Sequence, residues 1–393
     1  MKIKDSYDVV VVGSGPAGGI TALYAANNGA SVLILERDRE IGLPVRCAEG
    51  ISRKGLTQCL EPDERWIANH IEGGKLYAPN GTSCELIVEA IGDGFILERK
   101  IFDAAICQLA AEEGADILTK ADVYDLMWEN GEICGVKFRH FTTPKTVKAN
   151  IVVGADGPES RIGRMAGLKT DLGLNDIEST AQYVLTNISI EPHLCHFYFG
   201  NELAPGGYAW AFPKSKNMAN VGIGVIQKRT SGKTAKDLLD RFVSEHFPKA
   251  KVISFIAGSV PTAVTLEKIT ADHLMLVGDT AHQVNPLTGG GLSNILFAGK
   301  IAGEVAGEAA KTKDFSDQFL KKYRKIWWKE KGNQQKVLHK LKEIIFNFPD
   351  EKLNDLADTL NTIPKEKLTL KELFKTAIRE HPLLVAELVR VYF

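Results

Sequence analysis

The sequence lacks several features that would place it in a specialised class of protein. It has no run of about 18 uninterrupted apolar residues, so no transmembrane helix is predicted. Its six cysteines, at positions 47, 59, 84, 107, 134 and 195, include no CxxC pair, so neither a metal site nor a disulfide framework is expected. The formal net charge is −1 over 393 residues, so no overall field favours nucleic acid as a partner.

A targeting segment is also missing from the start of the sequence. The first predicted strand begins at Asp8, and we therefore expect no signal peptide before the fold. Together with the scattered cysteines, this favours a reduced, cytoplasmic setting. Hydrophobic residues make up 44% and charged residues 25%, which is ordinary for a soluble protein of two or three domains.

A glycine-rich motif, GSGPAG at 13–18, is the clearest feature that the sequence does contain. It follows an apolar run at 8–12 and precedes an Ala-rich stretch at 20–28 that predicts a helix. A second predicted strand at 32–35 then ends at Glu36. A GxGxxG turn in this strand–helix–strand setting is typical of an adenine-dinucleotide site. An ordinary glycine-rich turn is the alternative, and the setting disfavours it.

The residues of this motif have separate physical roles. Gly13 permits a tight turn, Gly15 lets the backbone approach a pyrophosphate, and Gly18 lets the helix pack closely on the strand. The start of the helix then offers free N–H groups and a positive dipole end to the phosphates. Glu36 is placed to accept hydrogen bonds from the ribose hydroxyls.

A second motif, far along the chain, favours FAD over a nicotinamide cofactor. Gly278-Asp279 follows a predicted strand at 273–277, and a glycine-rich run ending at Gly291-Leu292 opens a predicted helix. Asp279 could accept a hydrogen bond from a ribityl hydroxyl, and the helix start could face the flavin edge that becomes negative on reduction. A nicotinamide dehydrogenase needs no cofactor contact so late in the chain. Asp156-Gly157, which follows another predicted strand, is a third motif for contact with FAD.

The order of the predicted elements gives an α/β fold class. We expect a Rossmann-type FAD-binding domain, an inserted antiparallel β-sheet substrate domain and a C-terminal helical region. Further strands are predicted at 136–141, 146–149 and 151–154, and a hairpin turn at Asn80-Gly81. The expected boundaries are 1–60, 95–175 and 270–315 for the FAD-binding domain, 61–94 and 176–269 for the substrate domain, and 316–393 for the helical region.

The three motifs together resemble the flavoprotein superfamily of p-hydroxybenzoate hydroxylase over about residues 8–310. Two further segments, PVRCAEG at 44–50 and PGGYAWAFP at 205–213, are similar to the geranylgeranyl reductase family. The second is a full PxxYxWxFP match. The archaeal members that saturate the isoprenoid chains of ether lipids, the digeranylgeranylglycerophospholipid reductases, are the closest likeness. An aromatic hydroxylase or other monooxygenase on the same scaffold is the alternative, because it shares all three FAD motifs.

This resemblance implies a set of residues against the FAD. They come from the first motif, the 44–50 loop, a helix-start arginine, an adenine-side strand and the second motif. The residues are Ala17, Glu36, Cys47, Ala48, Gly50, Arg99, Val123, Asp279, Gly291 and Leu292. Val123 is the least distinctive, because its surroundings carry no pattern.

The aromatic residues of the second segment are candidates for the substrate site. Tyr208, Trp210 and Phe212 alternate with alanines, so in a strand they share one face. Periodicity alone favours rings that fill the core. The resemblance instead implies the wall of a lipid cavity, and we expect an apolar tunnel with few polar groups that ends at the flavin.

The resemblance also suggests a reaction, in which reduced FAD gives a hydride to an isoprenoid C=C and a proton donor supplies the other hydrogen. Cys47 is a candidate donor, because a free thiol is mostly protonated at neutral pH. Packing against the flavin is an equally good interpretation of Cys47. No second nucleotide-binding unit is visible, so the external electron donor is either NAD(P)H that docks transiently or a protein such as a ferredoxin.

A prenylated lipid substrate implies peripheral contact with a membrane. The segment 319–331 mixes cations with aromatic rings and predicts a helix. One hypothesis places this helix on an anionic membrane surface. The other interpretation, a solvated helix packed by its aromatic face, is slightly favoured.

Overall fold

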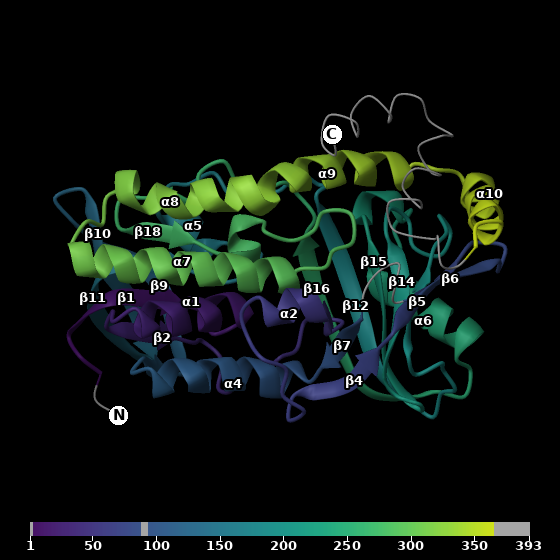
Figure 1. The fold of residues 1–393 in the computed structure, drawn as a ribbon, viewed down its shortest axis with the longest axis horizontal. Helices are drawn as coiled ribbons and strands as arrows, with labels where there is room; N and C mark the ends of the chain where they lie inside the picture. The colour runs from purple at the N-terminus through teal and green to yellow at the C-terminus, as the bar shows by residue number, and fades with distance from the viewer. Residues whose placement is uncertain (1–2, 88–92, 365–393) are drawn as a thin grey trace.

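The computed structural model describes residues 3–87 and 93–364 and places them in an elongated molecule with two halves (Figure 1). The left half in this view is a sheet covered by helices, and a second sheet makes up most of the right half. The predicted C-terminal helical region and the first predicted insertion each extend beyond the described residues, at 365–393 and 88–92.

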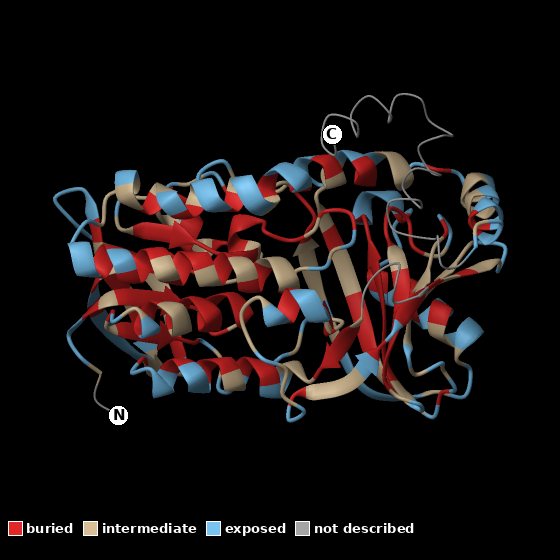
Figure 2. Ribbon diagram, viewed as in Figure 1, coloured by how far each residue is buried: buried red, intermediate tan, exposed pale blue. Residues whose placement is uncertain are grey.

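An eight-stranded sheet forms the left half. Its central strands carry near-continuous apolar runs because both faces are covered, and most of β1, all of β2 and the second half of β11 are correspondingly buried (Figure 2). Along the main path the order is β17-β18-β11-β1-β2-β8, with β10 beside β11 and β9 beside β10. The strands are β1 (Ser6–Val12), β2 (Val32–Leu35), β8 (Asp116–Leu118), β9 (Ala121–Glu129), β10 (Glu132–His140), β11 (Thr143–Gly154), β17 (Thr270–Ala271) and β18 (Leu274–Leu276).

The strand β11 differs from the prediction of two separate strands at 146–149 and 151–154. It is one continuous strand, because its first half pairs antiparallel with β10 while its second half pairs parallel with β1. The change of partner along one strand explains why its burial pattern changes from alternating to continuous.

Helices α1 (Pro16–Asn27), α4 (Arg99–Glu112) and α7 (Leu292–Thr312) cover this sheet. The helix α1 begins four residues before the predicted 20–28, because Gly15 is its N-cap and proline is tolerated in the first turn. The helix α7 packs along α1 through glycines. A Cβ on Gly299 or Gly303 would come within 2.9 or 2.5 Å of the backbone oxygens of Ala17 and Thr21.

A seven-stranded sheet forms the right half, in the order β16-β12-β15-β14-β13-β5-β6. One face packs on α6 (Ala235–His246), whose Leu238, Leu239 and Phe242 enter its core. The strands are β5 (Gly73–Tyr77), β6 (Ser83–Ile87), β12 (Ile177–Thr186), β13 (Leu194–Tyr198), β14 (Tyr208–Ser215), β15 (Met218–Val225) and β16 (Lys251–Pro261).

This sheet is antiparallel, as predicted, except where β13 pairs parallel with β5. The two strands come from different insertions into the FAD-binding segments, so no hairpin fixes their relative direction. Between the halves lies a three-stranded sheet, β3 (Gly50–Ser52), β7 (Gly94–Leu97) and β4 (Ile67–Ile71), in which β3 contacts α7 and β7 contacts β14. Two short α-helices, α2 (Arg53–Thr57) and α5 (Arg161–Met165), also lie within the described residues.

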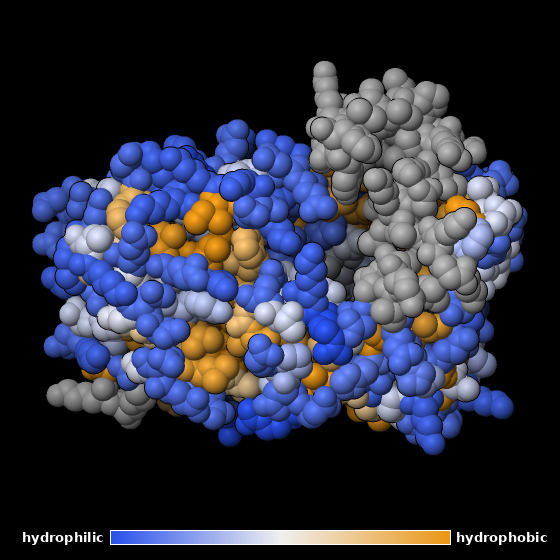
Figure 3. All heavy atoms as spheres, viewed as in Figure 1, coloured by the Kyte–Doolittle hydropathy of each residue, from blue (hydrophilic) through white to orange (hydrophobic). Residues whose placement is uncertain are grey.

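Helices α8 (Asp317–Trp327), α9 (Asn333–Ile345) and α10 (Asp350–Asn361) follow, with a π-helical turn after α8. Leu320, Tyr323 and Trp327 of α8 are fully buried, whereas Ile326 on the same helix is exposed. The Trp327 indole donates to the Thr265 hydroxyl at 3.0 Å. The slightly favoured interpretation, a helix packed by its aromatic face, agrees with these contacts, whereas contact of its outer face with a membrane stays a prediction. The surface in this region carries both hydrophilic residues and hydrophobic patches (Figure 3). None of the helices in the described ranges is long and apolar enough to cross a membrane.

Candidate active site

A cavity of about 1070 Å³ lies between the two halves. It is bounded by the carboxyl ends of β1 and β2, the first residues of α1 and α7, and one face of the seven-stranded sheet. This is the edge where open α/β sheets bind their ligands. Every residue predicted to bind the cofactor or the substrate lines this cavity, apart from Gly18.

The first glycine motif has the geometry that its spacing predicts. Gly13 adopts φ +104°, and a Cβ there would lie 2.4 Å from the backbone oxygen of Ala155. A Cβ on Gly18 would lie 1.9 Å from the oxygen of Gly13, so Gly18 serves helix packing. At Gly15, by contrast, no atom of the described residues other than its chain neighbours lies within 4 Å of a Cβ position. The space beside Gly15 is the open cavity at the start of α1, where a phosphate would bind.

Glu36 lies at the end of β2 and is almost fully buried. Its Oε2 accepts from the Ser14 N–H at 2.9 Å and from the Ser14 hydroxyl at 2.6 Å. Its Oε1 accepts from the Asp38 N–H at 2.7 Å. Glu36 therefore fixes the shape of the glycine turn as well as facing the cavity, a role that the sequence analysis missed.

The second motif forms the other end of the cavity. Gly291 is the N-cap of α7 and Leu292 its first residue. The Oδ1 atom of Asp279 is buried and has no hydrogen-bond partner among the described residues. Burial raises the pKa of Asp279 to about 6. An unpaired oxygen that lines a cavity fits a ligand hydroxyl, as the ribityl chain of FAD would supply.

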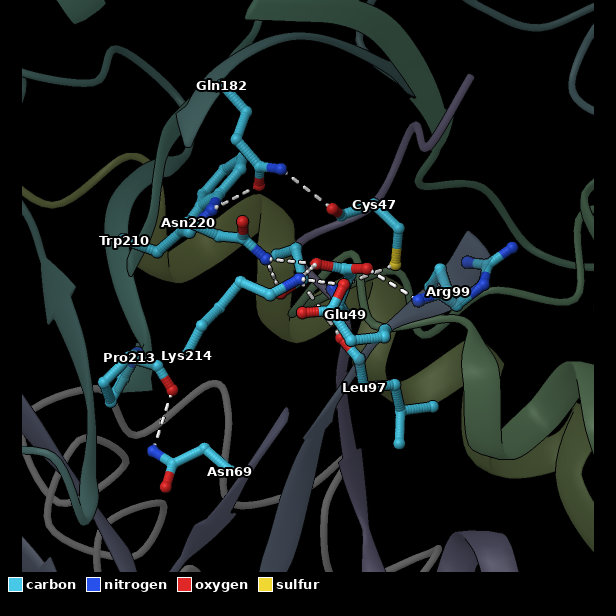
Figure 4. A network of polar contacts seen from close by, with 12 residues as sticks. Cys47, Glu49, Asn69, Leu97, Arg99, Gln182, Trp210, Pro213, Lys214 and Asn220 are labelled. Carbon is cyan, nitrogen blue, oxygen red and sulfur yellow. Dashed lines mark hydrogen bonds and ion pairs between the residues drawn. The ribbon is translucent and has the colours of Figure 1, made fainter. Parts of the chain in front are cut away.

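A buried polar network supports the loop at 44–50 (Figure 4). Glu49, with φ +73°, is almost fully buried at its centre. Its Oε2 accepts from Lys214 Nζ and from Asn220 Nδ2, both at 2.6 Å, and its Oε1 accepts from the Arg99 N–H at 2.8 Å. Lys214 also pairs with Glu98 at 2.9 Å. The Arg99 side chain is bound by Asp103 at 2.7 and 2.8 Å.

The sequence analysis missed Lys214, although its signal was present. Lys214 is two residues after Phe212, so it continues the period of two that places the aromatic rings on the cavity face. In the structure it ends that row, and its Nζ is buried among Glu49, Glu98 and the Leu97 carbonyl.

Cys47 lies in this loop, is partly buried and lines the cavity. Its Sγ accepts from the Glu49 N–H at 3.2 Å. Its carbonyl accepts from Gln182 Nε2 at 2.9 Å, and the Gln182 Oε1 accepts from the Trp210 indole at 3.0 Å. Burial raises the pKa of the Cys47 thiol, although nearby Arg99 opposes this effect.

The aromatic row of β14 faces the same cavity. Tyr208, Trp210 and Phe212 line it, while the alternate Ala209 and Ala211 pack in the core against α6. The predicted alternation is therefore confirmed. A Cβ on Gly222 would lie 2.3 Å from the Trp210 ring, so the neighbouring strand leaves room for the indole.

The cavity is more polar than the expected tunnel. Glu178, Thr180 and Gln182 alternate along β12 and face it, whereas Ala181, Tyr183 and Leu185 face the α6 core. These polar side chains gave no motif in the sequence, because only the pairing of β12 with β15 and β16 places them beside the aromatic row.

Comparisons with known proteins agree with this geometry. Residues 8–59 match the FAD binding domain family, and residues 176–260 match the geranylgeranyl reductase catalytic domain family. The chain is 42% identical to digeranylgeranylglycerophospholipid reductase 2 of Methanococcoides burtonii, over 99% of this chain and 97% of that one. It is also 42% identical to the digeranylgeranylglycerophospholipid reductase of Methanosarcina acetivorans, over 100% and 97%.

A solved structure, the geranylgeranyl bacteriochlorophyll reductase-like protein of Thermoplasma acidophilum, superposes with a TM-score of 0.92. It is 37% identical and aligns over 98% of this chain and 99% of its own. A flavin-dependent brominase, 16% identical with a TM-score of 0.72, shares the fold.

The fold, the open space beside Gly15 and the orphaned oxygen of Asp279 define an FAD-dependent oxidoreductase. Within that class, the chain belongs to the geranylgeranyl reductase family, among the digeranylgeranylglycerophospholipid reductases.

Proposed function

We propose that this enzyme saturates the C=C bonds of geranylgeranyl chains in prenylated phospholipids, as in archaeal-type ether-lipid biosynthesis. The observation that carries the proposal is the aromatic row Tyr208, Trp210 and Phe212, which lines the same cavity as the FAD-binding residues. Bound FAD in its reduced form supplies a hydride from N5. Burying a 20-carbon chain on such a wall could contribute on the order of 10 kcal/mol at ~0.8 kcal/mol per methylene.

The assignment of individual residues to the cofactor forms part of this proposal. Gly13, Gly15, Ala17, Gly18 and Glu36 would form or support the site for the ADP half. The loop residues Cys47, Ala48 and Gly50, together with Asp279, Gly291 and Leu292, would contact the flavin half. Arg99 would act beside this half, and Val123 on the adenine side.

Anaerobic turnover tests the proposed function directly. We expect dithionite-reduced enzyme to convert geranylgeranyl phospholipid, presented in liposomes, to saturated product detected by mass spectrometry. The product must form without oxygen, because reduction consumes only a hydride and a proton. A product that requires oxygen would instead support the monooxygenase alternative, and enzyme that leaves the lipid unchanged under both conditions would contradict reductase activity.

Cys47 is proposed to lie against the flavin, where its thiol could donate the proton or serve as a packing group. Replacement by alanine or serine separates these roles. If the thiol is the donor, turnover at fixed flavin content should fall about 100-fold or more, because general acid catalysis contributes factors of this size. Turnover is expressed per bound FAD, which is measured by absorbance. If it is unchanged in both variants, Cys47 is a packing residue and not the proton donor.

The electron donor and the membrane contact are further parts of the proposal. NAD(P)H would dock transiently or a ferredoxin would bind as a protein partner. The lipid substrate requires at least peripheral contact with the inner face of the cell membrane while it enters the cavity. Tyr323 and Trp327 of α8 are buried, so any contact through this helix would use its outer face.

A further inference from the structure

A buried carboxyl group stands in the cavity wall, separate from the residues assigned above. Glu178 lies on β12 and is 4% exposed. Its Oε2 would come within 3.0 Å of a Cβ on Gly224 and within 3.8 Å of one on Gly289. Two glycines therefore border the carboxyl, one on β15 and one in the loop that leads into α7 at the flavin end of the cavity.

The surroundings of Glu178 favour a carboxyl that gains and loses a proton near neutral pH. Burial raises the pKa of Glu178 to about 7, against the smaller opposing effects of the Lys342 charge and of a hydrogen bond with Thr262. From β14, Tyr208 faces it, and burial raises the pKa of that phenol above its usual value. Tyr208 is thus neutral over the same range, and its hydroxyl donates to the Thr288 carbonyl at 2.5 Å.

A chain of polar groups joins Glu178 to the surface. Lys342, from α9, is buried and donates to the Thr262 carbonyl at 2.7 Å, with its Nζ 3.5 Å from the Thr262 hydroxyl. The same ammonium donates to Asp176 Oδ1 at 3.1 Å. Asp176, which is partly exposed, contacts His339 Nε2 at 2.7 Å. The Thr262 hydroxyl and the Lys342 ammonium carry exchangeable protons, and Asp176 is a carboxylate that accepts at the solvent end, because despite its burial the contacts with His339 and Lys342 lower its pKa. Hydrogen-bonding groups therefore connect solvent to the cavity.

We propose that Glu178 is the acid that protonates the substrate alkene and that the chain through Thr262, Lys342 and Asp176 restores its proton from solvent. This inference rests on the proposed function. Saturation forms two C–H bonds: the hydride supplied by reduced FAD forms one, and the alkene π electrons form the other with the proton of Glu178. The O–H electron pair remains on the carboxylate, beside the positive charge of Lys342, until a solvent proton returns. Cys47 then keeps its packing role.

Glu178→Gln tests this inference, because it retains the shape of the side chain but carries no acidic proton. In the FAD-loaded enzyme we expect alkene saturation to fall about 100-fold or more. Bound FAD content and the rate of flavin reduction by dithionite should stay at the wild-type level. Glu343→Gln removes an exposed carboxylate from α9, one residue from Lys342, and should leave turnover unchanged.

The pH dependence gives a second, independent measurement. The donor must be protonated, so wild-type turnover should fall as the pH rises through the pKa near 7 of Glu178. This alkaline limb should be absent from the residual rate of Glu178→Gln and present in Glu178→Asp, which restores an acid. In the infrared spectrum of oxidised enzyme, a protonated-carboxyl band should titrate over the same pH range and be missing in Glu178→Gln.

Two outcomes would overturn the inference while leaving the proposed function intact. One is wild-type saturation of the lipid together with near-normal turnover by FAD-loaded Glu178→Gln. The other is an alkaline limb that persists in Glu178→Gln but disappears in Cys47→Ala. Failure of the wild-type enzyme to saturate any geranylgeranyl lipid would instead count against the proposed function itself.

Discussion

Gly15→Ala is expected to weaken FAD binding about 100-fold while the apoprotein keeps its stability. Apart from its chain neighbours, no atom of the described residues lies within 4 Å of the new Cβ. Gly15 has φ −64° and ψ 179°, which alanine adopts without strain. The methyl group would occupy the space through which a phosphate reaches the start of α1. Loss of one or two charge-assisted hydrogen bonds costs about 3 kcal/mol, or roughly 100-fold in affinity.

Gly18→Ala provides the opposite result in the same motif. Its Cβ would lie 1.9 Å from the oxygen of Gly13, which is backbone and cannot move aside. We expect the free energy of unfolding of the apoprotein to fall by about 2 kcal/mol or more. Urea unfolding followed by circular dichroism, paired with FAD titration by fluorescence quenching, separates the two effects. Equal loss of stability in both variants would contradict the distinct roles assigned to the two glycines.

Lys214→Met is expected to destabilise the enzyme by about 3–5 kcal/mol, because it leaves the Glu49 carboxylate buried without its cation. The Asn220 amide and the Arg99 backbone N–H would still donate to Glu49, but both groups are neutral. Adding Glu49→Gln to Lys214→Met removes the unpaired charge, so the double variant should recover much of the lost stability.

Denaturant unfolding of the two single variants and the double variant measures the coupling. Lys137→Met is the matched control, because its ion pair with Asp125 is exposed and should contribute less than about 1 kcal/mol. A double variant that is as unstable as the sum of the single variants would show that Glu49 and Lys214 do not act as a pair.

The parts of the site that could be predicted are those carried by short segments. The turn at Gly13 and the packing of Gly18 follow from spacing within six residues, because local geometry fixes them. The alternation of Tyr208, Trp210 and Phe212 likewise depends only on the period of a strand. The aromatic row could be assigned to a lipid cavity only through the family resemblance, since its periodicity equally describes a core.

The parts that could not be predicted depend on contacts between distant segments. Glu49 and Lys214 are 165 residues apart, and their pairing follows from the docking of the 44–50 loop on β14. Glu178 becomes part of the cavity only when β12 pairs with β15. The parallel contact of β13 with β5 was missed for the same reason, since sequence order suggests hairpins and here two insertions meet.

The glycine contacts between α1 and α7 fix the distance between the starts of these two helices. Gly299 lies against Ala17 and Gly303 against Thr21, so the two helices run in the same direction in a fixed register. Since α1 starts at Pro16 and α7 at Leu292, α7 projects beyond α1 by six residues, roughly 9 Å at 1.5 Å per residue. This offset fixes the distance between the two positive helix ends, of which one is proposed to bind the pyrophosphate and the other to face the flavin edge. A change in the α7 register would alter this spacing without replacing any residue that is proposed to contact the cofactor.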